Sequence, residues 1–91
     1  MISKEVTVHN SMGLHARPAT YFIQKANSYR CAISIEKDER TVNAKSLLGV
    51  LSMGVVKDSV INLIFDGSDE EEAMEGICEL IASGCGEVTA E

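Results

Sequence analysis

The sequence predicts an α+β fold in one domain that spans residues 1–91. Its length suits a single small domain. Segments with apolar residues at every second position alternate with segments whose apolar residues recur at helical spacing, in the order β-α-β-β-α-β-α. The economical architecture for this order is a mostly antiparallel sheet with helices on one face.

The first two elements are a strand and a helix. Residues Ile2 to His9 alternate between apolar and polar side chains, which predicts a strand. The turn-rich NSMG follows. From Ala16 to about Asn27, Ala19, Phe22, Ile23 and Ala26 recur at helical spacing. Pro18 lies in the first turn, where its missing N–H removes no helical hydrogen bond.

The middle of the chain predicts a hairpin and a short helix. Residues Cys31 to Glu36 alternate, KDER forms a polar turn, and Thr41 to Asn43 form the return strand. The apolar stretch LLGVLSMG then predicts a short helix with Ser46 as its N-cap.

The last two elements are a strand from Val60 to Phe65 and a helix from Ser68 to Ala82. Ser68 and Glu71 have the spacing of a capping box. Acidic residues in the first turn favour the positive end of the helix dipole. The apolar stripe is Ala73, Ile77, Leu80 and Ile81, and Gly84 and Gly86 end the helix.

The charge is unevenly distributed. The net charge is −6, but residues 1–65 hold eight Lys/Arg against five Asp/Glu, whereas residues 66–91 hold nine acids and no Lys or Arg. The acidic third argues against nucleic acid as a partner, while the mildly basic part suits an acidic protein surface. No apolar run approaches a membrane span, and the N-terminus lacks an apolar signal-peptide core. We therefore expect a cytoplasmic protein without membrane insertion.

The cysteines predict neither a disulfide framework nor a zinc site. Cys31, Cys78 and Cys85 are odd in number and form no CxxC pair. Buried small side chains are the simpler interpretation. We expect no metal and no cofactor.

The stretch GLHARPAT places several residues with chemical uses close together. Gly13 allows a tight turn, and His15 comes just before a helix whose start Pro18 fixes. The free N–H groups of Ala16 and Arg17 then point near the imidazole, at the positive end of the helix. This pattern predicts an anion site beside a histidine, with the Arg17 guanidinium as a further donor to phosphate.

A histidine in this setting suits a phosphoryl carrier. Imidazole is a good nucleophile near neutral pH. The sequence offers no carboxylate pair, Ser-His-Asp arrangement or phosphate-cradling glycine loop, so we expect partner proteins to supply catalysis. A histidine at a helix start can also be a simple cap, and an anion-binding module without covalent transfer is an open alternative.

GLHARPAT resembles the active-site signature of HPr, the histidine-containing phosphocarrier of the phosphoenolpyruvate-dependent sugar phosphotransferase system. The resemblance covers essentially the whole chain, including NAKS, LLGVLSMG and GSDEEEA. It implies that His15 is phosphorylated on Nδ1 and that Arg17 stabilises the phosphoryl group. It also implies an open-faced β-sandwich, with four antiparallel strands covered on one face by three helices.

The same resemblance implies the partners. The phosphoryl group would arrive from enzyme I and leave to the IIA domains of sugar permeases. Thr20 would belong to the surface that docks these partners. The carrier is expected to be a monomer.

KSLLGVLSMG resembles the regulatory site of HPr from low-GC Gram-positive bacteria. There an ATP-dependent HPr kinase/phosphorylase modifies the serine that matches Ser46. A phosphate at a helix N-cap faces unpaired N–H groups, and its charge would repel an acidic enzyme I surface. A catabolite control regulator would then dock on Leu47, Leu48 and Leu51. The alternative is that these leucines are ordinary core.

Two related functions remain as alternatives. One is a regulatory binding protein of the same fold, a variant that normally lacks the active histidine. The other is a nitrogen-related phosphocarrier paralogue with the same chemistry and different partners. An independent enzyme fits least, because the chain offers one nucleophile and no recognisable substrate pocket.

Overall fold

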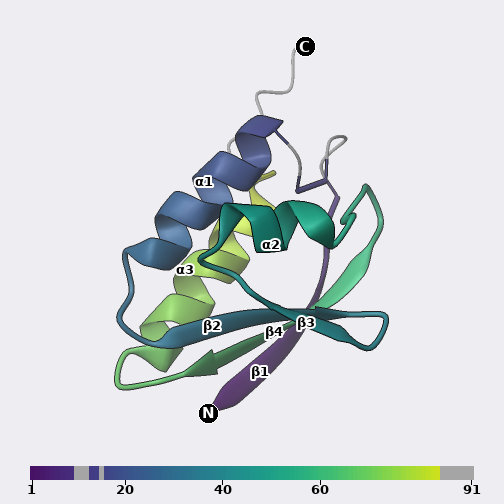
Figure 1. Ribbon diagram of the computed structural model, residues 1–91. Coiled ribbons are helices and arrows are strands. Elements are labelled where there is room, and N and C mark those ends of the chain that lie inside the picture. The colour runs from purple at the N-terminus through teal and green to yellow at the C-terminus, as the bar shows by residue number, and fades with distance from the viewer. Residues whose placement is uncertain (10–12, 15, 85–91) are drawn as a thin grey trace.

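The computed structural model describes residues 1–9, 13–14 and 16–84. The sheet has four strands and is covered by three helices in these ranges, so the predicted open-faced α+β sandwich is confirmed (Figure 1). No helix in the described ranges is long and apolar enough to cross a membrane. The elements in chain order are β1 (Ile2–Thr7), α1 (Ala16–Asn27), β2 (Ala32–Lys37), β3 (Arg40–Asn43), α2 (Leu47–Ser52), β4 (Val60–Asp66) and α3 (Glu70–Ala82).

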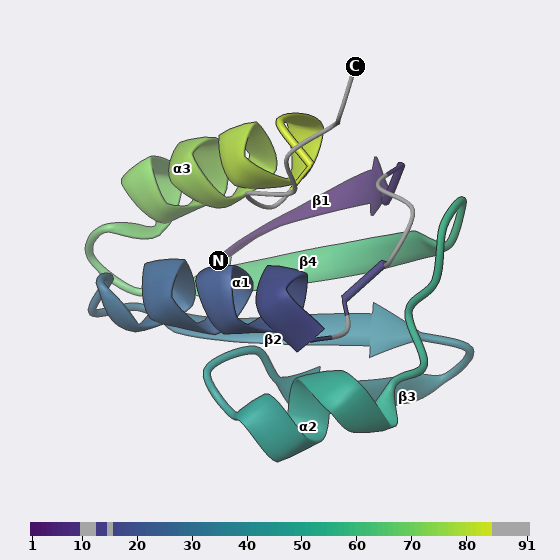
Figure 2. The ribbon, with the colours of Figure 1, turned by 90° about the horizontal axis from the view of Figure 1, so that it is seen from above.

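The strand order in the sheet is β1-β4-β2-β3, and every pairing is antiparallel. The central strand β4 pairs with β1 through Val6 opposite Ile61, and with β2 through Ile35 opposite Leu63. Seen from above, α3, α1 and α2 lie over the sheet in that order, with α2 above β3 (Figure 2). None of the helices in the described ranges lies on the other face of the sheet (Figure 1).

The core lies between the sheet and the helices. Strand β4 alternates strictly, with Ile61, Leu63 and Phe65 buried and the residues between them more exposed. On the helix side, α1 contributes Phe22, which is fully buried. The remaining buried apolar residues are Val8, Leu14, Ala19, Ala26, Cys31, Ile33, Ile35, Ala44, Val50, Met53, Val55, Ala73, Ile77 and Ile81.

Five strand boundaries differ from the prediction, and two of them, the end of β2 at Lys37 and the start of β3 at Arg40, flank the hairpin turn described below. Strand β1 ends at Thr7 rather than His9, although Val8 is buried and its N–H donates to the Ser59 carbonyl at 2.9 Å. Strand β2 begins one residue later, at Ala32. Strand β4 extends one residue further, to Asp66, which pairs with Ala32. Ladder hydrogen bonds, which alternation does not report, decide these ends.

The hairpin turn between β2 and β3 is shorter than the predicted KDER. Lys37 pairs with Arg40, so only Asp38 and Glu39 form the loop. Both have positive φ, 53° and 68°. This is the backbone of a type I′ turn, which matches the twist of the strands but suits Asn-Gly better than two acidic residues.

Helix α3 begins at Glu70, two residues later than predicted, and the capping box predicted for Ser68 and Glu71 is wrong. The N-cap residue is Asp69, and its side chain makes no capping bond. Instead Glu70 Oε1 accepts the N–H of Gly67 at 3.0 Å. The helix ends as predicted near Gly84, which has φ of 89°.

Candidate functional site

The segment that leads into α1 is fixed by the loop after α2. Gly13 and Leu14 are buried, and the Leu14 N–H donates to the Val55 carbonyl at 3.0 Å. Gly13 has φ of 59°. A Cβ on Gly13 would lie 2.6 Å from Val56 Cα and closest of all to the Val55 carbonyl oxygen. Glycine is therefore required here both by the backbone conformation and by the lack of space.

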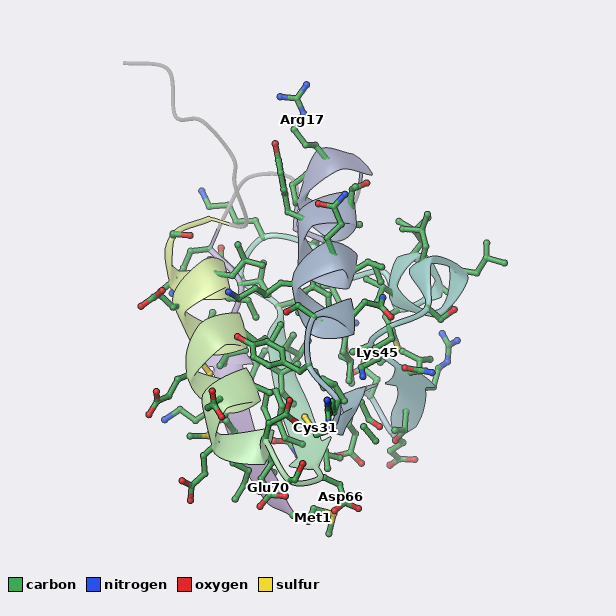
Figure 3. The ribbon with its side chains drawn as sticks, turned by 90° about the vertical axis from the view of Figure 1, so that its left-hand side faces the viewer. Met1, Arg17, Cys31, Lys45, Asp66 and Glu70 are labelled. Carbon is green, nitrogen blue, oxygen red and sulfur yellow. The ribbon has the colours of Figure 1, made fainter. Side chains whose placement is uncertain are left out.

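Helix α1 begins at Ala16, and its first turn contains one charged residue, Arg17, and two buried residues, Pro18 and Ala19. Pro18 and Ala19 are buried and hold this end of the helix on the core. Arg17 is exposed, and within the described ranges no ion pair or hydrogen bond of its guanidinium is found. Figure 3 shows Arg17 at the end of α1, pointing away from the body of the molecule. Its donors are therefore open to an anion from solvent or from a partner.

The predicted phosphoacceptor, His15, lies outside the described residues. Its neighbours Leu14 and Ala16 are described, and Ala16 is already helical. The anion-binding role of the Ala16 and Arg17 N–H groups is compatible with a helix that starts here, and it stays a prediction. Thr20, one helical turn after Arg17, is exposed.

The second predicted site residue, Ser46, is the N-cap of α2, as the sequence indicated. Its Oγ accepts the Gly49 N–H at 3.2 Å, and its carbonyl accepts the Val50 N–H at 2.9 Å. Ser46 has extended backbone angles, φ −106° and ψ 120°, and is half-buried. The bond to Gly49 uses Oγ as an acceptor, which leaves the hydroxyl proton for another partner.

Of the three leucines predicted to contact partners, Leu47 and Leu48 lie at the surface and Leu51 packs against the core. Leu48 is 81% exposed and Leu47 is 45% exposed. Leu51 is half-buried and packs against the core cluster. Helix α2 therefore presents two apolar side chains directly after Ser46, while Leu51 fits the core interpretation.

The two candidate sites lie on neighbouring helices. Helices α1 and α2 are in contact and run side by side over the sheet (Figure 2). A surface cation from α1, a capping hydroxyl and two exposed leucines thus occupy adjacent elements. This combination can bind an anion and an apolar partner surface. The described residues contain no group of three or more His, Cys, Asp or Glu side chains that could hold a metal ion.

The shifted carboxyl groups lie at the opposite end of the molecule. Figure 3 shows Glu70 beside Met1, far from Arg17. Backbone N–H donation from Arg30 and Cys31, at 2.8 Å each, lowers the pKa of Asp69, with the bond from Arg30 as the larger effect. The Gly67 N–H, and then the terminal ammonium of Met1, lower the pKa of Glu70.

The cysteines of the described ranges behave as structural residues. Cys31 is buried, and burial together with the Asp69 carboxylate raises the pKa of its thiol. Burial likewise raises the pKa of the Cys78 thiol, which is half-buried. Cys85 and Gly86 lie outside the described residues. Both described thiols are thus poor nucleophiles, in line with the expected packing role.

Sequence reasoning missed the support that the site receives from distant segments. The loop at Val55 and Val56 fixes the chain at Gly13, and the Asp58 N–H donates to the Val8 carbonyl at 2.6 Å. Backbone contacts of this kind leave no periodic signal. The only sequence signal was Gly13, because a glycine just before His15 indicates that another segment of backbone approaches closely there.

Comparison with known proteins agrees with this geometry. Residues 2–83 match the family model of the PTS HPr component phosphorylation site. The HPr-like protein Crh of Halalkalibacterium halodurans is 47% identical over 81 residues, which cover 89% of this chain and 96% of that protein. The crystal structure of HPr-C-His from Thermoanaerobacter tengcongensis superposes with a TM-score of 0.94 at 43% identity, covering 98% of this chain and all of the other.

A third relative bears on assembly and regulation. The crystal structure of Crh from Bacillus subtilis, described as a catabolite-repression protein in a swapped dimer, has a TM-score of 0.74 at 38% identity. It covers 92% of this chain and 97% of that one. The expected monomer fits poorly with this relative. Family match, identity and fold agree over most of the chain, and the chain therefore belongs to the HPr family of phosphocarrier proteins.

Proposed function

We propose that this chain carries phosphoryl groups in the phosphoenolpyruvate-dependent sugar phosphotransferase system, with His15 as the acceptor. The observation that carries the proposal is the GLHARPAT motif in its described setting. Gly13 is held against Val55, α1 starts directly after the histidine, and Arg17 is exposed. Family membership supports the carrier role, and the donor and acceptors follow from the resemblance to HPr.

In the proposed reaction, His15 Nδ1 attacks the phosphorus of phospho-enzyme I. The N–P bond forms as the bond from phosphorus to enzyme I breaks, and the bonding electrons return to enzyme I. The reverse event on a IIA domain of a sugar permease empties the carrier. Arg17 and the N–H groups at the start of α1 would stabilise the phosphoryl oxygens in both steps. Catalytic power beyond this comes from the partners, in the cytoplasm.

Intact-mass spectrometry tests the proposal. The protein is incubated with phosphoenolpyruvate and an enzyme I that is active on another HPr, beside a His15→Ala control. We expect one acid-labile phosphoryl group on the wild type and none on the variant. If the wild type gains no phosphate, the chain is a regulatory or anion-binding member of the family instead.

A regulatory role through Ser46 is the second candidate, and the structure of α2 favours it. Ser46 caps the helix, and Leu47 and Leu48 are exposed directly beside it. We propose that an HPr kinase/phosphorylase transfers the γ-phosphoryl group of ATP to Ser46 Oγ. The O–P bond forms as the β–γ bridging bond breaks, ADP leaves, and the hydroxyl proton passes to the kinase. A catabolite control regulator would then bind α2.

Ser46→Asp, compared with Ser46→Ala, tests the electrostatic part of this candidate. The added negative charge next to α1 should slow phosphorylation by enzyme I, whereas the alanine variant, once shown to be folded, should react normally. Equal rates in the two variants would remove the electrostatic basis for a second switch.

Two alternatives concern partners and assembly. A nitrogen-related paralogue would share the chemistry of His15 and differ in its partners. Measuring phosphoryl transfer from the phosphorylated protein to a sugar-specific and to a nitrogen-specific IIA domain distinguishes the paralogue from a sugar phosphocarrier. A swapped dimer has been described for the Crh relative. In the sheet that the described residues form, β1 is an edge strand and pairs with β4 alone. Light scattering on the protein as it elutes from a size-exclusion column distinguishes a monomer from a dimer.

A further inference from the structure

Two polar side chains join the end of α1 to the segment before α2. Asn27 Nδ2 donates to the Lys45 carbonyl at 3.2 Å and to the Ile23 carbonyl of its own helix at 3.0 Å. Lys45 Nζ donates in the opposite direction, to the Tyr29 carbonyl at 2.7 Å. Two long-range bonds with different donors therefore connect the same pair of segments. We refer to Asn27, Lys45 and the Tyr29 carbonyl as the clamp.

The segment that the clamp holds is also closed internally. The Lys45 N–H donates to Asn43 Oδ1 at 2.8 Å, and the Ser46 N–H donates to the Asn43 carbonyl at 3.1 Å. Ser46 is the next residue after Lys45, and its hydroxyl is oriented by the Gly49 N–H. A shift of Lys45 must therefore displace the Ser46 hydroxyl or break one of these bonds.

The ammonium of Lys45, the residue directly before Ser46, already donates to the Tyr29 carbonyl. It is half-buried and lies near the end of α1 farther from Arg17 (Figure 3). Carbonyl groups after the last helical turn are suitable partners for a cation, because the helix dipole is negative there. The bond to the Tyr29 carbonyl thus gives Lys45 a structural use and draws its charge away from the solvent.

We propose that Asn27 and Lys45 are positioning residues that hold the Ser46 hydroxyl in place for phosphorylation. This inference rests on the proposed modification of Ser46 and adds how the site is built. It implies that the kinase accepts Ser46 within the folded segment rather than as an extended peptide. A change at Asn27, nineteen residues before Ser46 in sequence, then alters how well Ser46 is phosphorylated.

Amide hydrogen exchange on the unmodified protein tests the clamp without any partner. Asn27→Asp has nearly the same shape but loses the donor and faces two carbonyls with a carboxylate. Losing a hydrogen bond of this type should speed exchange of the Ser46 and Gly49 amides about fivefold. Exchange at Leu63, in the central strand, should not change. Ser28→Ala is the matched control, because Ser28 Oγ donates only within its own turn, to Lys25.

A second pair of variants separates the ammonium from the rest of the side chain. Lys45→Met keeps the apolar stem and loses the charge, so it should give the same local acceleration as Asn27→Asp. Lys45→Arg keeps a cationic donor and should restore most of the protection. Unchanged exchange in both Asn27→Asp and Lys45→Met, or equal acceleration throughout the sheet, would overturn the clamp.

Kinase assays then test two claims separately: that Ser46 is phosphorylated, and that Asn27 and Lys45 position it for phosphorylation. With an HPr kinase/phosphorylase and ATP, we expect kcat/KM for Asn27→Asp and Lys45→Met to fall about fivefold relative to Ser28→Ala and the wild type. Wild-type rates in both variants would overturn the positioning role alone. If the wild type itself takes no phosphate from a kinase that modifies another HPr, the proposed regulation of Ser46 fails.

Discussion

Gly13→Ala is the substitution that most directly tests how the chain before His15 is held. The variant adds one methyl group at a buried residue with φ of 59°. That methyl would lie 2.6 Å from Val56 Cα and 2.8 Å from the Val55 carbonyl carbon. Both neighbours are backbone atoms, so rotation of a side chain cannot make room. The loop at Val55, the Gly13 segment, or both must move.

The loss of folding free energy expected for Gly13→Ala has three contributions. Left-handed backbone costs an alanine about 1–2 kcal/mol relative to glycine. Moving packed backbone apart costs about 1–3 kcal/mol, as overpacking does. The displaced loop weakens the bond between the Leu14 N–H and the Val55 carbonyl, at about 1 kcal/mol. The free energy of unfolding should therefore fall by about 3–6 kcal/mol, and Tm by about 12 °C or more in a domain of this size.

Gly54→Ala is the matched control. Gly54 has φ of 63°, and nothing lies within 4 Å of the position its Cβ would take. This variant should lose only the backbone part, about 1–2 kcal/mol. Urea unfolding followed by circular dichroism measures both. If Gly13→Ala and Gly54→Ala lose the same stability, the close approach between Gly13 and Val55 does not constrain the chain.

Three further predictions concern the turn, the acid response and the carrier site. Glu39→Gly should raise stability by about 0.5–1 kcal/mol in thermal unfolding, because glycine adopts the φ of 68° freely; no gain over Glu39→Ala would contradict this. Hydrogen bonds from the backbone N–H groups of Arg30 and Cys31 lower the pKa of Asp69 in the folded state. The Asp69 carboxylate therefore stabilises the fold fully at pH values above its pKa in the unfolded chain. This stabilisation is lost as pH falls through its lower pKa in the folded protein. The stability gap between wild type and Asp69→Asn in urea should shrink from about pH 5 towards pH 2, and a constant gap would exclude that role. Arg17→Ala should slow phosphorylation by enzyme I about tenfold or more with unchanged urea unfolding, because Arg17 is exposed; unchanged kinetics with enzyme I and with a IIA domain would remove it from the mechanism.

Most elements of this fold follow from local sequence patterns. The apolar spacing in α1 predicts both of its ends, and Ser46 predicts the start of α2 through a cap that the structure contains. These signals are local, because helical periodicity and N-capping depend on residues within one turn. The open sheet with helices on one face also follows, since three amphipathic helices need an apolar surface to cover.

The parts that sequence could not predict depend on contacts between distant segments. The start of α3 was misplaced because Glu70, and not Glu71, accepts the backbone N–H that precedes the helix. Both glutamates suit that role by residue type. Likewise, nothing in NAKS indicates that Lys45 turns to the Tyr29 carbonyl, since a lysine beside a serine is equally suited to solvent. The residues on either side of His15 were predictable as a helix start, but their support by Val55 was not.

The strand order β1-β4-β2-β3 has a consequence for how the chain acquires its structure during synthesis. Thr7 pairs with Val60, so β1, which is synthesised before β4, waits for β4 before it gains its neighbour in the described sheet. The hairpin of β2 and β3 forms from local sequence, whereas β4 must insert between β1 and that hairpin. Sheet formation is therefore non-local and late, which slows folding relative to a meander of the same size. A nascent chain that ends before Val60 has no means of completing the sheet, and its apolar residues remain exposed until the central strand arrives.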